Sequence, residues 1–265
     1  MNRSIVLPDR LRLEEDAAFS TPVPSKTEEP EASPSHVDQE AQPNTAENGS
    51  YSQFSARMLP ALTSEQLKLR NTLLFAHEQQ GVRSVLITGA NEGAGATSVA
   101  ASLALGLSLD PQKEILLVDA NVQRPQLHKL FNLKMSEGVT AASENGANFL
   151  DMAVVVGAPN MHVMASINSN RRGTFDIRRI IAVLPALHEA FNFVIVDAPP
   201  LSLHADVLML SLHLNSVILV AEAERTRIQE VQKTAQELQR AKANLLGVVL
   251  NRQKDRVPPT IKRFL

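Results

Sequence analysis

Short apolar runs that alternate with helical segments constrain the fold of this chain more than any other feature. Five runs rich in β-branched residues or leucine read as buried strands, and a weaker sixth joins them: Ser84–Thr88, Ile115–Asp119, Phe193–Asp197, Ser216–Ala221, Leu246–Leu250 and, weakest, Met161–Ala165. Segments with helical periodicity lie before and between them: Thr63–Gln79, Thr97–Leu109, Arg178–Ala190 and Thr226–Ala243. Because parallel strands need crossover helices, this order predicts an α/β fold with a doubly wound, mostly parallel sheet flanked by helices.

Composition narrows the class of protein. The chain has 265 residues, of which 44% are hydrophobic and 4% aromatic, and it has no cysteine. Disulfides, thiolate metal sites and cysteine nucleophiles are therefore excluded. The formal net charge of -2 argues against a general nucleic-acid binder, so no nucleic-acid partner is expected. Without a long apolar run or a secretory-type N-terminus, the chain is expected to be cytoplasmic.

The first 50 residues differ in composition from the rest. They contain 6 prolines and 10 acidic but only 4 basic residues. A segment of low hydrophobicity that is rich in Pro, Ser and Glu cannot offset the entropy lost on ordering. We therefore expect a disordered arm over residues 1–55 and one compact domain over residues 56–265. The arm is either a solvated tail or a tether that binds a partner through the apolar segment Ile5–Leu13.

A glycine-rich loop follows the first strand and leads into an Ala/Leu-rich helix. Its sequence is GANEGAGATS, from Gly89 to Ser98. Glycines let backbone amides approach a phosphate, and the helix N-terminus adds positive potential. The phosphate-loop pattern G-x-x-x-x-G-K-[ST] places a lysine after its second glycine. Here Ala96 follows Gly95, and Ala90 replaces the first glycine. The glycine-rich turn between strand and helix is therefore kept, but the positively charged lysine is absent. The alternative is a tight strand–helix turn that binds nothing.

Three further motifs follow in order: DANVQRPQLHKLF at residues 119–131, FVIVDAPP at residues 193–200 and GVVLN at residues 247–251. Together with the loop, they resemble the bacterial tyrosine kinase family of capsule and exopolysaccharide biosynthesis. That family is a branch of the MinD/ParA-like P-loop ATPases. The resemblance covers Thr63 to Asn251 and implies a P-loop NTPase-like fold.

The resemblance also implies roles for individual residues, with ATP or ADP and Mg²⁺ as the cofactors. The positions that would contact nucleotide are Gly93, Gly95, Ala96, Thr97, Ser98 and Asn251, the last of which faces the adenine ring in the family. The family's metal positions fall on Thr97, Asp119 and Asp197. The two aspartates are also the candidate catalytic residues.

Several departures from the family pattern point to lost catalysis. Ala96 stands at the lysine position, Asn121 replaces the second acid of D-x-D, and the motif arginine falls on Gln123, next to Arg124. Removing one well-placed electrostatic contact typically costs on the order of 10²–10³ in rate. The single tyrosine, Tyr51, lies far from the C-terminus, where the family carries its phosphorylated tyrosine cluster. The sequence therefore predicts a pseudokinase with weak or lost use of ATP.

The function expected from this resemblance is a regulator or scaffold of exopolysaccharide or capsule synthesis and export. The implied partner is an inner-membrane polysaccharide co-polymerase of the chain-length determinant type, which would hold the chain at the periphery of that membrane. A homo-oligomer is left open, because only Arg70 survives from the family's E-x-x-R-x-x-R assembly helix.

Two alternatives remain. One is an active ATP-dependent tyrosine kinase or ATPase with a substitute lysine, for which Lys113 and Lys129 are nearest in sequence. The other is a MinD/ParA-like positioning ATPase.

Overall fold

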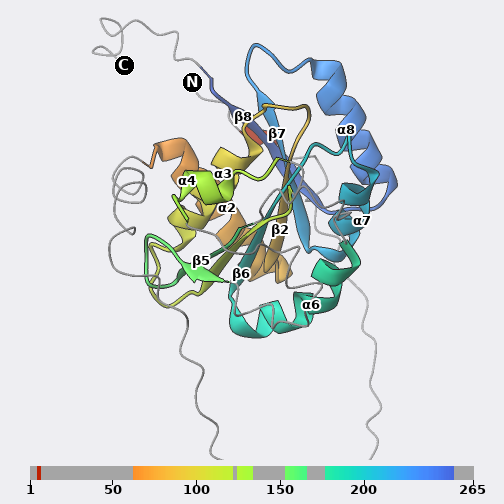
Figure 1. The fold of residues 1–265 in the computed structure, drawn as a ribbon. Coiled ribbons are helices and arrows are strands. Elements are labelled where there is room, and N and C mark those ends of the chain that lie inside the picture. The colour runs from red at the N-terminus through yellow and green to blue at the C-terminus, as the bar shows by residue number, and fades with distance from the viewer. Residues whose placement is uncertain (1–4, 7–61, 122–123, 134–152, 166–176, 254–265) are drawn as a thin grey trace, which may run out of the picture.

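The fold is built around one sheet. The computed structural model describes residues 5–6, 62–121, 124–133, 153–165 and 177–253. Within them, eight strands form one sheet in the order β1-β8-β7-β2-β6-β3-β5-β4 (Figure 1). The strands are β1 (Ile5–Val6), β2 (Ser84–Gly89), β3 (Ile115–Asp119), β4 (Val154–Val155), β5 (Met161–Met164), β6 (Phe193–Ala198), β7 (Ser216–Glu222) and β8 (Leu245–Asn251). Neighbours from β8 to β5 run parallel, while β1 and β4 pair antiparallel at the two edges.

Helices cover both faces of this sheet. They are α2 (Ser64–Gln80), α3 (Ala96–Leu107), α4 (Leu127–Leu130), α6 (Ile177–Ala190), α7 (Ala205–His213) and α8 (Ile228–Arg240). Buried residues of α2 and α3 belong to the core on one face, and those of α6, α7 and α8 belong to the core on the other (Figure 1). The predicted doubly wound α/β fold is confirmed. No helix in the described residues is long and apolar enough to cross a membrane.

The central strands are buried along their whole length, which explains their continuous apolar sequence. In β2, Val85 and Ile87 face the α2–α3 core, while Leu86 between them faces the α6–α7 core. Successive side chains of a strand point to opposite faces, so a strand covered on both sides has no place for a polar alternation. This alternation of side chains also determines which face of the sheet a polar residue at a strand end occupies.

The capping signals of the first long helix are confirmed. The Thr63 side chain accepts a hydrogen bond from the backbone of Gln66, and the Gln66 side chain accepts one from the backbone of Thr63. Gly81 ends the helix in a left-handed conformation, with φ 67°. These local signals fix the helix within a residue or two of its predicted bounds.

Some elements differ from the sequence predictions. The short helices α4 and α7 and the edge strands β1 and β4 were not anticipated, and most of the predicted strands extend one or two residues further. The strand β1 lies inside the arm for which disorder was predicted, a prediction that remains untested. Their backbone pairs with Val249 and Val248 of β8, an otherwise open edge whose unpaired amides and carbonyls favour strand addition. The rest of residues 1–55 lies outside the described part.

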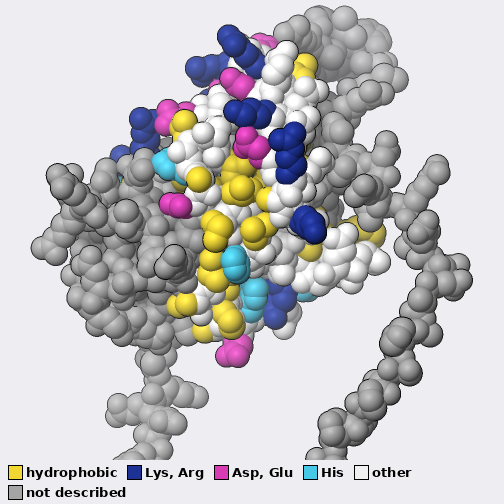
Figure 2. Space-filling model, turned by 90° about the vertical axis from the view of Figure 1, so that its right-hand side faces the viewer, with side chains coloured by type: hydrophobic (Ala, Val, Ile, Leu, Met, Phe, Trp, Pro, Cys, Tyr) yellow, Lys and Arg dark blue, Asp and Glu magenta, His cyan; other side chains and the backbone are white. Residues whose placement is uncertain are grey.

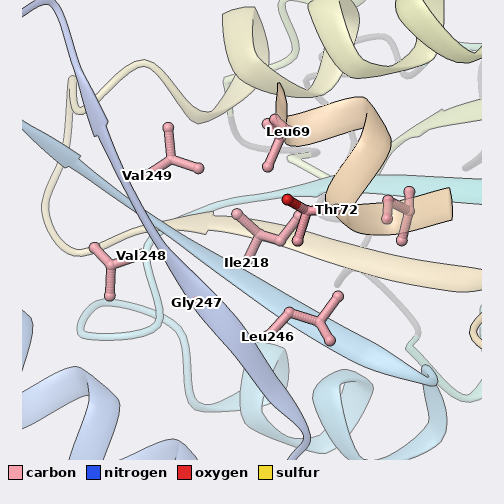
Figure 3. Close-up of a pocket in the computed structure, with 8 residues that line it drawn as sticks. Leu69, Thr72, Ile218, Leu246, Gly247, Val248 and Val249 are labelled. Atoms are coloured by element: carbon pink, nitrogen blue, oxygen red, sulfur yellow. The ribbon is translucent and has the colours of Figure 1, made fainter. Parts of the chain in front are cut away.

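Two apolar surfaces lie away from the strand ends. A small pocket between α2 and strands β7 and β8 is lined by Leu69, Thr72, Leu73, Ile218, Leu246, Gly247, Val248 and Val249, and its lining has no charged side chain (Figure 3). Figure 2 shows another face, on which apolar side chains form a strip beside a group of Lys and Arg side chains. At and beside α7, Leu203, Met209 and Leu212 are 55%, 55% and 47% exposed. The lining of the pocket lacks the positive groups that a phosphate would need.

Candidate functional site

The sequence motifs meet at the carboxyl edge of the sheet. Gly89 ends β2, Asp119 ends β3, Asp197 is the next-to-last residue of β6, and Asn251 ends β8. In open parallel α/β sheets, ligands bind beyond the carboxyl ends of the strands. The fold therefore gathers segments far apart in the sequence at the edge where a ligand site is expected.

The glycine-rich loop is held closely against the end of β8. Gly95 has φ 90° and is the N-cap of α3, and a Cβ atom at this position would collide with the side-chain amide of Asn251. Asn251 Nδ2 donates to the carbonyl of Ala94 at 2.9 Å. Only glycine fits such a left-handed position with so close a neighbour. In this structure, Asn251 positions the loop through that amide.

The first turn of α3 has no charged side chain. Ala96 begins the helix, Thr97 is half-buried and Ser98 is exposed. The free backbone amides of a helix N-terminus and the helix dipole favour an anion. Gly93, at φ 78°, is exposed to solvent in the middle of the loop. The predicted nucleotide-contacting positions of the loop and of the first turn of α3 thus lie together, and none of their own side chains is charged.

Two buried carboxyl groups lie beside this helix terminus. Asp119 and Asp197 are 0% and 1% exposed, and they are register partners on β3 and β6. Neighbouring strands are about 4.8 Å apart, and both side chains point to the α2–α3 face. Burial, and next the charge of Asp119, raises the pKa of Asp197 well above its ordinary value. Burial raises the pKa of Asp119 to about 6, against the lowering effect of backbone hydrogen bonds from Leu127, Gln126 and Asn121.

The two carboxyl groups differ in their partners. Asp119 Oδ1 accepts from the amide of Asn121 at 3.1 Å, and Oδ2 accepts from the amides of Gln126 and Leu127 at 3.0 and 3.1 Å. Asp119 therefore shapes the turn that leads into α4. Asp197 receives a hydrogen bond from the Thr97 side chain that lowers its pKa, but its Oδ2 is buried without a partner in the described residues. A buried polar atom without a partner costs about 1–3 kcal/mol, more when charged, which marks this oxygen as a candidate ligand for a cation.

The residues present fit a magnesium ion that is shared with phosphate. Thr97 and Asp197 supply a hydroxyl and a free carboxylate oxygen beside the helix terminus. No cluster of three or more acidic, histidine or cysteine side chains occurs in the described residues. Mg²⁺ commonly takes one or two carboxylates and completes its shell with substrate phosphates and water. Asp119 is less available, because both of its oxygens already accept backbone hydrogen bonds.

The positive side chains around the loop are arginines. Arg124 Nη1 lies 3.1 Å from the Glu92 carboxylate. Arg252 Nη1 donates to the carbonyl of Gly93 at 3.3 Å and to Glu222 at 3.0 Å. Sequence reasoning singled out neither Arg252 nor Glu222, although Arg252 directly follows the recognised Asn251. These contacts surround the loop with two acid–arginine pairs.

The two lysines considered as substitutes lie elsewhere in the fold. Lys113 precedes the amino end of β3, opposite the site, where it lies 4.0 Å from Asp110. That position rules it out as a replacement for the missing charge. Lys129 is an exposed residue of α4. Gln123 and Tyr51 lie outside the described residues, and Arg70 donates to the carbonyl of Gly106 in α3.

Comparisons with curated proteins identify kinases as relatives. The chain is 28% identical to the putative tyrosine-protein kinase EpsB of Ralstonia solanacearum over 83% of its own length, but it spans only 29% of that longer protein. It is 27% identical to the tyrosine-protein kinase YwqD of Bacillus subtilis, with 73% of this chain and 83% of YwqD covered. The expected resemblance to bacterial tyrosine kinases of capsule and exopolysaccharide loci is confirmed.

Solved structures and a family comparison agree with this fold. The chimerical protein CapA2B2 matches with a TM-score of 0.66 and 29% identity, over 72% of this chain and 84% of that one. MinD of Pyrococcus horikoshii, solved with Mg-ADP, matches in fold with a TM-score of 0.57 and 20% identity, over 69% and 76%. The ParA family, described as NUBPL iron-transfer P-loop NTPase, matches residues 81–262, which is more than half of the chain. The chain therefore belongs to the ParA family of P-loop NTPases.

Proposed function

We propose that this chain is a tyrosine-kinase-like regulator or scaffold of capsule or exopolysaccharide synthesis and export, which binds Mg-nucleotide weakly and does not transfer phosphate. The similarity to EpsB and YwqD supports the process. The single observation that supports lost transfer is Ala96 at the start of α3, where the phosphate-loop pattern requires lysine. The proposal includes a domain over residues 56–265 that carries this site.

The chemistry of the site supports binding more than catalysis. Magnesium, when bound, would neutralise charge on the phosphate oxygens. Thr97 and Asp197 would hold it, the loop amides and the α3 terminus would orient the phosphates, and Asp119 would keep the adjoining turn in place. Phosphoryl transfer depends almost entirely on positioning and electrostatic stabilisation of the transferred group. A site without its lysine retains enough groups to bind, but lacks the contact that transfer needs most.

The proposed partner is an inner-membrane polysaccharide co-polymerase. The similarity to the chimerical protein CapA2B2 and to kinases of capsule systems supports a partner of this kind. Such a partner would bring the chain to the periphery of the membrane from the cytoplasmic side. In this arrangement, the bound nucleotide would change the surface that the partner meets instead of supplying phosphate.

Restoring the lysine tests this proposal. The full chain is incubated with radiolabelled ATP, Mg²⁺ and a tyrosine-containing copolymer, with YwqD as the positive control. We expect no transfer by the wild-type chain. In calorimetry, Ala96→Lys should bind Mg-ATP about tenfold more tightly, because one charge-assisted phosphate contact is worth about 1.5–3 kcal/mol.

A charge-matched variant separates the loop position from overall charge. Gln112→Lys adds the same positive charge at an exposed position before the amino end of β3. It should leave Mg-ATP affinity within about twofold of wild type, because a Debye length of about 10 Å screens it from the opposite edge of the sheet. Transfer by the wild-type chain at the rate of YwqD would overturn the pseudokinase proposal. So would equal affinity of the Ala96→Lys variant and the wild type.

A further inference from the structure

Arg252, which directly follows β8, contacts the glycine-rich loop. Its Nη1 atom lies 3.3 Å from the carbonyl of Gly93 and 3.0 Å from Glu222 Oε1. The preceding residue, Asn251, bonds the next carbonyl of the loop, at Ala94. Two consecutive side chains at the end of one strand therefore touch two consecutive carbonyls of the loop. The sequence brings a full positive charge to the loop that lost its lysine.

The backbone of Arg252 is held in an uncommon conformation. Its φ is 57°, in the left-handed region that residues with a side chain seldom adopt. The amide of Arg252 donates to Asn251 Oδ1 at 2.9 Å, which stabilises the turn locally. Such a backbone costs of order 1 kcal/mol and is found mostly at functional sites.

We propose that Arg252 binds the phosphate groups of the nucleotide in place of the missing lysine, after leaving Glu222. This inference rests on the nucleotide binding included in the proposed function. The buried Oδ2 of Asp197, which has no partner in the described residues, is a separate observation that points to a ligand at this edge of the sheet. Arginine suits this task because its planar guanidinium can form two parallel hydrogen bonds to phosphate oxygens.

Other arginines near the loop are less suited to the role. The side chain of Arg124 is 71% exposed, and it pairs with Glu92 of the loop without contacting the loop backbone. Arg225 contacts the same Glu222 at 3.4 Å but makes no contact with the loop in the described residues. Among the described residues, Arg252 is the arginine that combines a contact to the loop backbone with an acidic partner outside the loop. This difference makes Arg225 a natural matched control.

Glu222 serves as the holding partner of Arg252 while phosphate is absent. Its side chain is only 9% exposed, whereas that of Arg252 is 54% exposed. The hydrogen bond from Arg252 is the first cause that holds the pKa of Glu222 below its ordinary value. Because the arginine is already half in solvent, moving it to a phosphate requires little further desolvation. Glu222 then competes with phosphate for the same guanidinium.

The first experiment compares two arginine variants with two probes. Mg-ADP and inorganic pyrophosphate are titrated by calorimetry into the full chain and into its Arg252→Gln and Arg225→Gln variants. Arg252→Gln should weaken both probes by about tenfold, the loss expected for one charge-assisted hydrogen bond. Arg225→Gln should change neither by more than about twofold. Pyrophosphate lacks the base and ribose, so an equal loss for both probes locates the contact at phosphate.

The second experiment separates phosphate binding from simple bracing of the loop. If Arg252 must leave Glu222 to bind phosphate, Glu222→Gln should bind Mg-ADP several-fold more tightly, because the competing carboxylate is gone. If the Glu222–Arg252 pair instead only braces the loop, Glu222→Gln should weaken binding. In a double-mutant cycle, the gain from Glu222→Gln should disappear in the Arg252→Gln background.

The outcomes distinguish failure of this inference from failure of the proposed function. Normal binding of both probes by Arg252→Gln, an equal loss in Arg225→Gln, or weaker binding by Glu222→Gln each overturns the role of Arg252 alone. Loss of Mg-ADP affinity without loss of pyrophosphate affinity overturns it as well. No binding of Mg-ADP by the wild-type chain overturns nucleotide binding in the proposed function, and the role of Arg252 with it.

Discussion

The two edges of the parallel sheet differ in how their polar groups are paired. At the amino edge, Asn215 Oδ1 accepts hydrogen bonds from the amides of Arg83 and Ser84 and from the Ser84 hydroxyl, each at 3.0 Å. The Asn160 side-chain amide donates to three loop carbonyls, at Ser108, Asp110 and Lys113. These side chains tie strands and loops together, although two ring nitrogens near this edge, His162 Nδ1 and His188 Nε2, are also buried without a hydrogen-bond partner in the described residues.

The carboxyl edge holds polar groups that the chain itself does not fully satisfy. Asp197 keeps a buried oxygen without a partner in the described residues, and its neighbour Asp119 is an acid with a raised pKa. Two acids in register repel each other, so this edge stores unfavourable electrostatic energy that a cation would relieve. At the amino edge, the named side chains thus join strands and loops, whereas the carboxyl edge holds two adjacent buried acids whose charge a cation would neutralise.

The largest expected effect on the free energy of unfolding comes from removing the Asn215 side chain at the amino edge. Asn215→Ala should lower the free energy of unfolding by about 2–4 kcal/mol, because it leaves the buried amide and hydroxyl of Ser84 without their acceptor. Urea unfolding of the full chain measures this loss. Asn244→Ala, which removes one exposed hydrogen bond to the Asn215 carbonyl, is the control and should cost less than about 1 kcal/mol. Equal losses in both variants would contradict a special role for the Asn215 network.

A smaller change in the free energy of unfolding, of opposite sign, is expected for a substitution at the carboxyl edge. Asp197→Asn should raise the free energy of unfolding at pH 8 by about 1–2 kcal/mol, because it removes a buried charge and its repulsion with Asp119. The same change should remove Mg²⁺-dependent nucleotide binding. A stabilising substitution that abolishes binding is the signature expected of a site maintained for function.

The sign of the pH dependence follows from the raised pKa values. The folded state holds these protons more tightly than the unfolded chain, so the contribution to stability is greatest below the ordinary pKa of 3.8. It is lost as the pH rises through the value of about 6 for Asp119. The advantage of Asp197→Asn over wild type should therefore be small near pH 4 and should grow as the pH rises. The exposed Asp206→Asn is the control, and a pH-independent advantage of Asp197→Asn would contradict the buried-acid explanation.

Local signals in the sequence were enough to predict most of the fold. The continuous apolar strands, the Thr63 cap and the Gly81 stop depend on neighbouring residues, and all appear within a residue or two of their predicted places. The helix α7 was missed because the segment ADVLMLSLH is short and mostly apolar and gives no clear helical stripe. The antiparallel strand β1 was missed because its partner lies more than 240 positions away in the chain, from Val6 to Val248.

Only the site residues that lie within the family motifs were predicted from the sequence. The register of Asp119 with Asp197 follows from the strand ends, but the free oxygen of Asp197 depends on side-chain packing that sequence does not show. The Glu222–Arg252 pair arises because β7 and β8 are neighbours in register, with Glu222 beside Asn251. No short-range pattern contains such a contact. The missing lysine was evident from the sequence, whereas the proposed replacement, Arg252, could be recognised only from its contacts in the fold.

Calorimetric titration of ADP into the full chain, with and without Mg²⁺, tests the central claim most directly. We predict binding that requires Mg²⁺, disappears in Asp197→Asn, and is about tenfold weaker than in Ala96→Lys. Such a result would show that the unsatisfied carboxyl edge is a working nucleotide site without its lysine. No binding at millimolar ADP, or binding that is unchanged by Mg²⁺ and by Asp197→Asn, would contradict a ligand role for this edge.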